Sequence, residues 1–524
     1  MSKQESPRRK VTFRVQRTSR RRGRSQRTKC RPQERSWSAG LKVSSDGAAM
    51  MVHAGVALPR LLADRVGLTT GLSEAVARKG FSPAYDRGRV LVDLACALAA
   101  GATGLTDAEA IAAQLALLNE SGHGPSDTTI WRSLGELADR VGPDGLPRRR
   151  LAIAIADARA AAWETIVARH GALPAVRVAG HPLTHTSTDP DGSPSTRCVT
   201  VIRLDGTLID AASNKARAAG TYRGGYGFFP LAAWCSNIGD NLAVMLRPGN
   251  AGSFTASDHI AVLNAAIAQV PTAHQRDLLV TVDGAGASHA LIEHLTALNT
   301  AAGHGARGRR VEYSVGWPID ERTLKAIALA PESAWSQAVY ADGDLDDDAE
   351  VIIDLTGLLR ASMYGELLPS WPQDLRVIAR RVPRAPGEQA QLGQDPNYRY
   401  GAFATNTRIG QIQWLDARHR THAHVEDAVK ELKNTGARLL PMADRAHNTA
   451  WMQLVAIATS LTAWLRHAVL TGDLAIALTP TLRYRIFSTP ARLVHHARAR
   501  LLRFPSTWPH SGAISTAWAL LHPG

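Results

Sequence analysis

Apolar and polar positions along the chain change their period near residue 196. Between about Val52 and Arg150, apolar residues recur every three to four positions, which is the period of amphipathic helices. From Cys198 to about Val315, short β-branched runs alternate with helical segments. The pattern predicts a helical N-terminal region followed by a mixed α/β core.

The N-terminal region predicts helices at Arg87–Ala100 and Ala108–Leu118, and a third that begins after the run Ser126-Asp127-Thr128-Thr129. A helix, a Gly/Pro turn and a second helix form the layout of a helix-turn-helix DNA reader. The side chains that such a reader presents to a groove are here Thr128, Thr129 and Arg132. An ordinary helical bundle is the alternative, and the sequence alone does not choose between them.

Downstream, Gly142–Arg150 is predicted to be a linker, Leu151–His170 a helix and Pro182–Ser195 a polar loop. The predicted strands of the core are Cys198–Leu204, Gly227–Cys235, Leu242–Leu246, Leu278–Val282 and Arg310–Val315, with helices at Thr255–Val270 and Ser288–Leu298. This order resembles that of an RNase H-like domain. The resemblance implies that the first and fourth strands are neighbours at the centre of the sheet.

After the core, residues 317–413 predict an antiparallel, β-rich insertion with strands at Leu375–Val382, Tyr398–Thr405 and Ile412–Leu415. Helical signal resumes at His419 and again at Asn448–Leu470, and a basic helix is predicted at Arg492–Arg503. The expected domains are a disordered basic arm (1–40), a helical DNA-binding domain (52–150), the first part of the core (196–316), the insertion (317–413), the last part of the core (414–470) and a C-terminal helical segment (471–524).

Charge separates the first 40 residues from the rest. The 524-residue chain has a formal net charge of +15, and the 14 Lys/Arg and two Glu of residues 1–40 account for +12 of it. These residues lack any apolar period, which predicts disorder. A non-specific DNA-binding arm and a merely solvated extension are both open interpretations. The body has only local basic patches with which to attract phosphate.

Cysteine usage and hydropathy favour a cytoplasmic protein without a membrane span. Cys30, Cys96, Cys198 and Cys235 form no CxxC pair, so neither a disulfide framework nor a zinc knuckle is indicated. The least polar stretch, Thr449–Leu465, is shorter than the ~20 residues of a spanning helix and predicts a buried one.

Candidate chemistry begins where two predicted strands end. Asp205-Gly206 closes the first strand and Asp283-Gly284 the fourth, so the two carboxylates are expected at one edge of the sheet. Carboxylates are the hard oxygen ligands that Mg²⁺ or Mn²⁺ prefers, and two such ions suffice for phosphoryl transfer on DNA. A third acid is needed from elsewhere in the chain.

Glu426 is the candidate for that third acid. If its segment were one α-helix, the residues on its polar stripe would be His419, His422, Glu426, Lys430 and Lys433. The acid on this face is expected to bind a metal ion, and the basic side chains that flank it are expected to contact phosphate. A solvated charged face is the alternative reading of this stripe.

Asp205, Asp283 and Glu426, with a β-rich insertion before the Glu, resemble the acids of DDE transposases of bacterial insertion sequences. Related elements mark the last helix with Tyr, Arg three later, Glu four later and Lys seven beyond. This chain has His419, His422, Glu426 and Lys433 at those spacings, so the acid and the Lys match and the first two positions differ.

The chain more closely resembles the thirteen-eighty family of insertion-sequence transposases. The motifs that carry this resemblance are Asp86–Leu94, Gly224–Pro230, Leu246–Ser253, Ala256–Ile260, Val425–Asp427 and Lys433–Gly436. The resemblance implies a bacterial, nucleoid-associated homodimer. Such a dimer binds the element's terminal inverted repeats and target DNA, and performs metal-dependent cleavage and strand transfer with two Mg²⁺ or Mn²⁺ ions per site.

Under this resemblance, the residues expected to contact DNA near the acids are Lys215, Arg217, Arg223, Arg247 and Asn250. A tight turn between strand and helix is the alternative role for the glycines around Arg247 and Asn250. Two other functions remain. One is a catalytically inactive, transposase-derived DNA-binding protein. The other is a haloacid-dehalogenase-like phosphatase, which Leu204–Leu208 resembles, but Arg203 occupies the place of that family's nucleophilic Asp.

Overall fold

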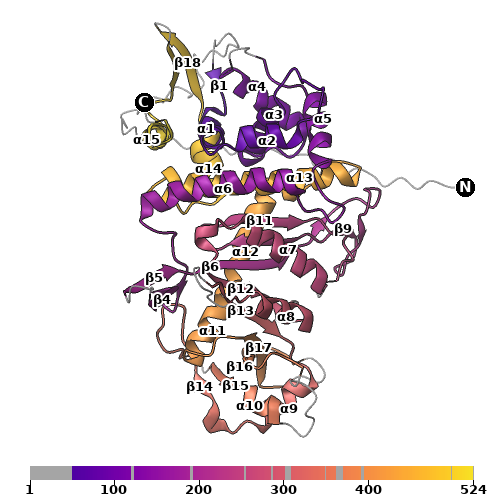
Figure 1. Ribbon diagram of the computed structural model, residues 1–524, viewed down its shortest axis with the longest axis vertical. Coiled ribbons are helices and arrows are strands. Elements are labelled where there is room, and N and C mark those ends of the chain that lie inside the picture. The colour runs from indigo at the N-terminus through magenta and orange to yellow at the C-terminus, as the bar shows by residue number, and fades with distance from the viewer. Residues whose placement is uncertain are drawn as a thin grey trace, which may run out of the picture. The chain divides into compact units, whose positions relative to one another are not determined.

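The computed structural model describes the chain in separate stretches within the unit Ala49–Gly524 (Figure 1). The described residues are 50–119, 123–188, 193–252, 255–284, 287–300, 308–347, 350–361, 370–390, 395–496 and 499–522. The basic arm at 1–40 lies outside them, so both interpretations of it stay open.

A mixed nine-stranded sheet is the centre of this unit. Its strands, in spatial order, are β11 (Asp240–Met245), β10 (Leu231–Cys235), β6 (Thr200–Gly206), β12 (Asp277–Val282), β13 (Arg310–Trp317), β17 (Tyr398–Thr405), β16 (Arg376–Pro383), β15 (Val351–Asp354) and β14 (Ser336–Gln337). Strands β6, β12 and β13 run parallel and the other pairs are antiparallel. The predicted adjacency of the first and fourth core strands is confirmed, because β6 and β12 pair directly.

Alternation along β6 gives the sheet two different faces. Ile202 and Leu204 lie in the main apolar core with residues of helix α7 (Ala256–Gln269), whereas Val201 joins a second cluster with Ala417 of helix α11 (Ile412–Arg420). Successive side chains of a strand point to opposite faces. Asp205 therefore shares the face of Val201, the side on which α11 and the following helices pack.

The predicted insertion continues this sheet. Strand β17, predicted at Tyr398–Thr405, is confirmed, and it pairs with β13 through Ser314–Trp317. The prediction of a strand at Ile412–Leu415 is wrong, because these residues begin α11. Leu415 is buried against Ile378 and Phe403 of the neighbouring strands. The helices associated with this region are α9 (Glu321–Leu329) and α10 (Thr356–Ala361).

Six helices precede the sheet: α1 (Ala57–Arg65), α2 (Leu68–Val76), α3 (Arg87–Ala100), α4 (Leu105–Ala116), α5 (Asp127–Ala138) and α6 (Arg149–His170). The prediction of α3 is confirmed, and the Ser126 hydroxyl caps α5 by accepting the Thr129 N–H, as predicted. The predicted linker ends at Arg148, since α6 begins at Arg149. One apolar core includes residues of these helices, of the sheet and of the C-terminal elements.

Helix α13 (Arg445–Val469) contacts α1, α3, α5, α6 and β11. In Figure 1, α6 and α13 run between the N-terminal helices and the sheet. Almost every residue of α13 from Asn448 to Leu465 is buried, so the predicted buried helix is confirmed. Among the described residues no single helix is long and apolar enough to cross a membrane; α3 and α4 pass that test only together, as a pair bent by 108°.

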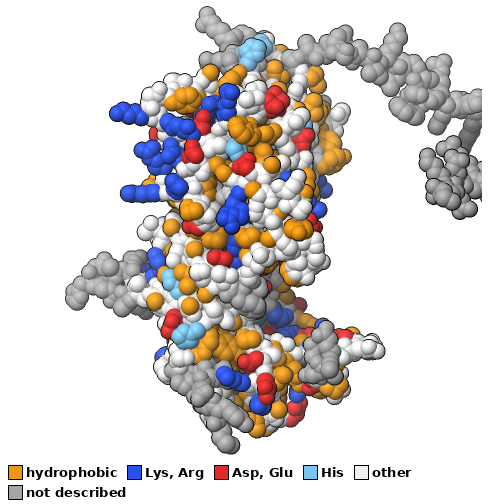
Figure 2. All heavy atoms as spheres, turned by 90° about the vertical axis from the view of Figure 1, so that its right-hand side faces the viewer, with side chains coloured by type: hydrophobic (Ala, Val, Ile, Leu, Met, Phe, Trp, Pro, Cys, Tyr) orange, Lys and Arg blue, Asp and Glu red, His pale blue; other side chains and the backbone are white. Residues whose placement is uncertain are grey.

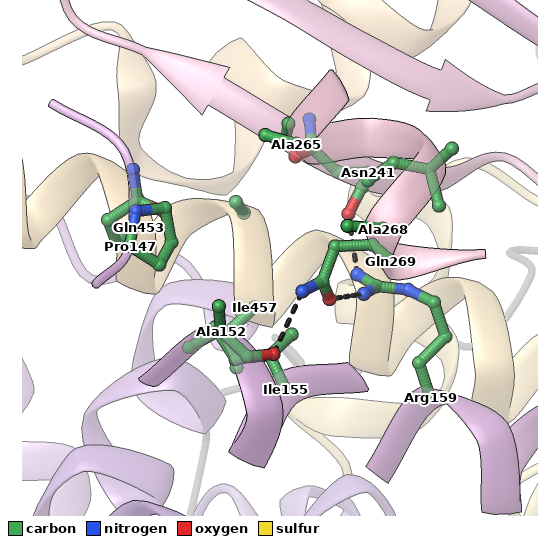
Figure 3. A pocket seen from close by; sticks show the side chains of 13 residues that line it. Pro147, Ala152, Ile155, Arg159, Asn241, Ala265, Ala268, Gln269, Gln453 and Ile457 are labelled. Atoms are coloured by element: carbon green, nitrogen blue, oxygen red, sulfur yellow. Dashed lines mark hydrogen bonds between the residues drawn. The ribbon is translucent and has the colours of Figure 1, made fainter. Parts of the chain in front are cut away.

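A cavity of about 240 Å³ lies where α6, α7, β11 and α13 meet. Figure 3 shows Arg159 of α6 beside Gln269 of α7, to which it donates through Nη1. Arg159 Nη2 also donates to the carbonyl oxygen of Asn241 (2.8 Å), and Gln269 Nε2 donates to that of Ala152 (2.8 Å). These bonds tie the helical region to the edge of the sheet.

Two further predictions are wrong. Pro182–Ser195 contains the strand β4 (Thr184–Thr188) and the first two residues of its partner β5 (Pro194–Cys198) rather than only a loop. Arg492–Arg503 forms the antiparallel strands β18 (Ala491–His496) and β19 (Ala499–Arg503) rather than a basic helix. Ala491 and Leu493 are buried while Arg492 between them is exposed, which is the alternation of a strand.

The remaining C-terminal elements are α14 (Thr479–Leu482), the π-helical turn η8 (Arg483–Phe487) and α15 (Ser511–Leu521). Helix α15 contacts α1, and β18 pairs with β1 (Met50–Met51). The C-terminal segment therefore packs on the first helices of the described chain.

Candidate active site

Two of the three predicted acids are neighbours at the ends of adjacent strands. Asp205 lies near the end of β6, and Asp283 follows the last residue of β12. The parallel register pairs Leu204 with Val282, so the next residues along the two strands are Asp205 and Asp283. Both lie on the face of the sheet that α11 and its successors cover.

The charges of the acids interact. The pKa of Asp205 is raised to about 7, first by burial and then by the charge of Asp283, with a further contribution from Glu426. The Gly206 N–H, which donates to Asp205 Oδ1 (2.7 Å), and the Lys433 ammonium lower that pKa but do not cancel the rise. Asp205 therefore ionises less readily than a solvated carboxyl group, because of its burial and because of the negative charges near it.

Glu426 stands in the first turn of α12 (Val425–Leu432), and its side chain is exposed. The 3₁₀ turn η5 (Thr421–His424) precedes this eight-residue helix, and the π-helical turn η6 (Lys433–Ala437) follows it. Within η6, Gly436 has φ +108°, a conformation that favours glycine. In the described part of the chain, no three His, Cys, Asp or Glu side chains form a group that could hold a metal ion.

A cleft of about 770 Å³ opens beside the strand ends. Asp283 and Gly206 line it from the sheet, and Lys433 lines it from η6. Tyr222 and Arg223 line it from the turn that joins β8 (Ala219–Gly220) to β9 (Tyr226–Phe228), which form a small sheet with β7 (Ile209–Asp210).

Glycines shape one wall of this cleft. Gly224 and Gly225 have φ +82° and +79°, so the turn after Arg223 favours glycine at both positions. A Cβ on Gly249 would lie 2.6 Å from backbone oxygens of Ala219 and Gly227, so the loop after β11 packs closely against the small sheet. The glycines around Arg247 and Asn250 thus serve close backbone packing.

Comparison with known protein families identifies the chain. A family model for the transposase DDE domain, group 1, matches residues 180–523, from the strand β3 (His181–Pro182) through α15. The chain belongs to this transposase family. The match includes Asp205, Asp283 and Glu426 and leaves out the N-terminal helices.

No curated protein matches the chain. Among solved structures, the cryo-EM structure of a piggyBac transposase synaptic complex with hairpin DNA is similar, with 10% identity and a TM-score of 0.34. That similarity covers 84% of this chain and 80% of the other. The closer resemblance to the thirteen-eighty family stays a prediction.

Several predicted DNA contacts of the transposase are accessible. Arg217, Arg223 and Asn250 are exposed, and the latter two line the cleft. Lys433 is half-buried in the cleft wall, where burial and the charges of Arg438 and Arg223 lower its pKa. Lys430 is exposed but pairs with Asp427 (3.0 Å).

The predicted helix-turn-helix contacts lie on α5. Thr128 and Arg132 are exposed, and Thr129 is half-buried because its N–H and hydroxyl group both face the Ser126 cap. Trp131, exposed next to Arg132, stacks on His447 of α13 with ring centroids 4.6 Å apart. The outer face of the first turns of α5 is therefore open to a partner.

Two predicted contacts have partners inside the protein instead. Lys215 Nζ donates to the carbonyl oxygens of Leu440 and Met442. Arg247 is only 4% exposed; it donates to the Phe229 carbonyl oxygen (3.0 Å) and pairs with Asp258 (3.1 Å). Both cations hold segments around the cleft together, so neither presents a free cationic group to phosphate in this structure.

The single polar stripe predicted from His419 to Lys433 is also wrong. His419 lies on α11, His422 on η5 and Lys433 on η6, so an unbroken α-helical period does not hold. His419 Nδ1 bonds the Ser314 hydroxyl (2.9 Å) and its ring stacks on Phe403, while His422 Nδ1 bonds the Thr281 hydroxyl (2.8 Å).

Burial is the main reason that the pKa of each of these histidines falls to about 3. Both rings are neutral at pH 7, and they anchor the segment to the sheet where charged phosphate contacts were expected. The two positions that hold Tyr and Arg in the related elements are thus occupied in this chain by histidines with a structural role.

Sequence reasoning missed two charged residues beside the acids. Arg203, on the same face of β6 as Asp205, is 1% exposed and donates to the hydroxyls of Ser236 (2.7 Å) and Thr421 (3.0 Å). Glu431 of α12 is buried and accepts hydrogen bonds from the Thr479 N–H (2.9 Å) and hydroxyl (2.6 Å). The available signal for Arg203 was a lone cation in an apolar strand, two positions before an acid. Because residue 203 is an arginine, it cannot serve as the nucleophilic Asp of a phosphatase.

Proposed function

We propose that this transposase cuts and joins DNA at the open end of β6 and β12, with Asp205, Asp283 and Glu426 as its catalytic acids. One observation carries the proposal. Two carboxylates follow each other across adjacent parallel strands beside a cleft of about 770 Å³, and burial together with the charge of Asp283 raises the pKa of Asp205 to about 7. Such an arrangement costs folding free energy, so a role beyond folding explains why it persists.

The residues present fit divalent metal ions in chemistry. The three acids offer only oxygen donors, which suit Mg²⁺ or Mn²⁺, and a bound cation would offset the burial and the neighbouring acids that raise the pKa of Asp205. When bound, one or two such ions would make an oxygen nucleophile available near neutral pH and stabilise the charge of the leaving oxygen. Asp205, Asp283 and Glu426 would hold them.

The described residues contain no preformed group of three acids, so we infer that Glu426 completes the site by moving closer to the strand ends. Helix α12 is short, and non-α turns bound it on both sides. We infer that a change of the Glu426 rotamer, or a small shift of α12 between these turns, brings the third carboxylate to the other two when DNA and metal are present. The exposed position of the Glu426 side chain leaves room for this change.

The residues of the cleft would position the DNA strand. Arg223 and Lys433 line it as cations, and Asn250 adds an amide that can bond a phosphate oxygen. Tyr222, 73% exposed in the same wall, offers a ring on which an unpaired base can stack. Arg217 would meet the strand at the mouth of the cleft.

The N-terminal helices would recognise the terminal inverted repeats of the element, with Thr128, Thr129 and Arg132 facing the groove. Exposed basic residues in this region include Arg78, Lys79, Arg132, Arg148, Arg149 and Arg150. Figure 2 shows Lys and Arg side chains gathered along one edge of the helical part of the molecule. Two protomers would pair the two ends, in the compartment that holds the bacterial chromosome.

The test is cleavage of linear DNA that carries the ends of the element, with Mg²⁺ or Mn²⁺. Asp205→Asn, Asp283→Asn and Glu426→Gln should each lower the cleavage rate at least about 1,000-fold while DNA binding in a gel-shift assay is retained. Asp427→Asn is the matched control for Glu426, since it removes an exposed acid from the next position of α12. Full cleavage by any of the three variants removes that residue from the site.

The same assay separates the proposal from the inactive, DNA-binding alternative, which the lack of a preformed three-acid group in the described residues keeps open. A wild-type chain that binds the ends but leaves them uncut with either metal supports that alternative. Short inverted repeats with a flanking target duplication around the gene would support transposition by an independent route.

A further inference from the structure

Another cavity, of about 380 Å³, is lined on one side by Val425, Asp427, Ala428 and Glu431 of α12. Its wall includes Arg203 of β6, Trp234 of β10 and Arg466 of α13, together with Glu431 and Asp427 of α12. None of its lining residues also lines the cleft beside the acids. The cavity is therefore separate from the proposed cleavage site.

Three residues of this wall each have a buried nitrogen donor with no hydrogen-bond partner among the described residues: Arg203 Nη1, Trp234 Nε1 and Arg466 Nε. Arg203 and Trp234 are each only 1% exposed. The partners of the other Arg203 N–H groups are two neutral hydroxyls, and no carboxylate pairs with Arg203 among the described residues. Buried donors are rarely left without acceptors, and a buried cation without a counter-charge is costly.

The two acids of the wall are already engaged. Glu431 accepts from the Thr479 N–H and hydroxyl, and its nearest oxygen is 4.0 Å from Arg466 Nη1. Asp427 is exposed and pairs with Lys430 (3.0 Å). Neither acid of the wall therefore supplies the acceptor that the three donors lack among the described residues.

We propose that this cavity binds one phosphate-type oxyanion, which accepts hydrogen bonds from Arg203, Trp234 and Arg466. An oxyanion supplies several acceptor oxygens and a counter-charge together, whereas water supplies no charge. The ion is either free phosphate or a phosphodiester of the DNA backbone. Bound there, it connects β6 to α13 beside α12 and so restrains the helix that carries Glu426, a consequence that rests on the proposed function.

The test measures thermal unfolding of the full-length protein in increasing inorganic phosphate, with NaCl adjusted to constant ionic strength and without metal or DNA. We expect a saturable rise of Tm in the wild type. Trp234→Phe keeps the ring and removes the N–H, so it should weaken the apparent phosphate affinity about tenfold. Arg203→Met should abolish the saturable rise, and Arg322→Gln, which removes an exposed cation of α9, should leave it unchanged.

A Tm that rises without saturation, or equally in the wild type and in Trp234→Phe, overturns the proposal, because general salt effects or water then explain it. Should Arg203→Met fail to fold, the Trp234→Phe comparison decides alone. The readout is independent of catalysis. Loss of cleavage activity with a normal phosphate response overturns only the proposed function, and the reverse result overturns only this inference.

A second arm identifies the source of the oxyanion. If the DNA backbone supplies it, inorganic phosphate at constant ionic strength should lower DNA affinity in the wild type and have less effect in Trp234→Phe. If free phosphate is the ligand, DNA affinity should be the same in both proteins at every phosphate concentration.

Discussion

Two carboxylates of the same sheet have opposite surroundings. Asp240, which begins β11, is fully buried and accepts hydrogen bonds from Arg159 Nε (2.9 Å), Trp163 Nε1 (2.9 Å) and Trp464 Nε1 (2.8 Å). Asp205 is less buried, and its pKa rises to about 7, first because of its burial and then because of the charges of Asp283 and Glu426. Burial alone therefore does not distinguish a structural acid from a candidate catalytic one.

Asp240 and Asp205 differ in whether donors within the protein stabilise the negative charge of the carboxylate. The Asp240 cluster ties α6, α13 and β11 together, since Arg159 and Trp163 belong to α6 and Trp464 belongs to α13, which packs on β11. The Asp205 and Asp283 pair contributes repulsion to the folded state instead. Substitutions at the two sites should consequently change stability in opposite directions.

The largest effect is expected at Asp240. Asp240→Asn removes the counter-charge of Arg159 in a dry environment, so the free energy of unfolding should fall by about 3–5 kcal/mol. Urea unfolding measures it. Asp139→Asn, which breaks an exposed pair with Arg78, is the control and should cost less than about 1 kcal/mol. A loss at Asp240 no larger than the control would remove the basis of the comparison.

The opposite sign is expected at Asp205. Its pKa in the folded protein is about 7, against an ordinary value of 3.8, so the folded state favours the protonated form. The associated stability is complete below about pH 4 and is lost as pH rises through 7. At pH 8 the full shift would correspond to about 4 kcal/mol, and partial solvation reduces this to about 2 kcal/mol.

Asp205→Asn should therefore stabilise the metal-free protein by about 2 kcal/mol at pH 8 and have little effect at pH 4. Thermal unfolding at the two pH values measures this difference. A few millimolar Mg²⁺ should stabilise the wild type at pH 8 and the variant much less. A variant that is less stable than the wild type at pH 8 contradicts the inferred repulsion.

A smaller effect on metal dependence is expected at Glu431. Its carboxylate accepts hydrogen bonds from Thr479 of α14 and, among the described residues, has no cation in close contact. Glu431→Gln weakens the bond that anchors α12 to Thr479, so Glu426 should be held less firmly. The Mg²⁺ concentration for half-maximal cleavage should rise about tenfold, or about 1.4 kcal/mol, with kcat recovered at saturating Mg²⁺. A lower kcat with unchanged metal dependence assigns Glu431 a different role.

The smallest effects extend the comparison from acids to cations. Arg223→Gln, in the cleft, should weaken DNA binding about fivefold and lower the salt dependence of binding by about one phosphate contact. Lys215→Met should leave DNA affinity within about twofold, because its ammonium already bonds two carbonyl oxygens. Equal losses of DNA affinity in both variants would show that internal hydrogen bonding does not separate these roles.

The sequence was sufficient where the deciding interactions are local. The apolar runs of β6 and β12, the acids that follow them, the period of α3 and the Ser126 cap all depend on residues within one or two turns or strands. The pairing of β6 with β12 needed the order of elements as well, because strand adjacency is a long-range property.

Only the tertiary structure decided which polar groups are left for function. Lys215, Arg247, His419 and His422 look like phosphate contacts in the sequence, but each of them bonds a carbonyl, a carboxylate or a hydroxyl elsewhere in the chain. Glu426 was identifiable by its spacing, whereas its place beside two non-α turns depends on how α12 packs. The sequence determines which side chains are charged or can form hydrogen bonds, but only the fold determines which of them have partners within the chain.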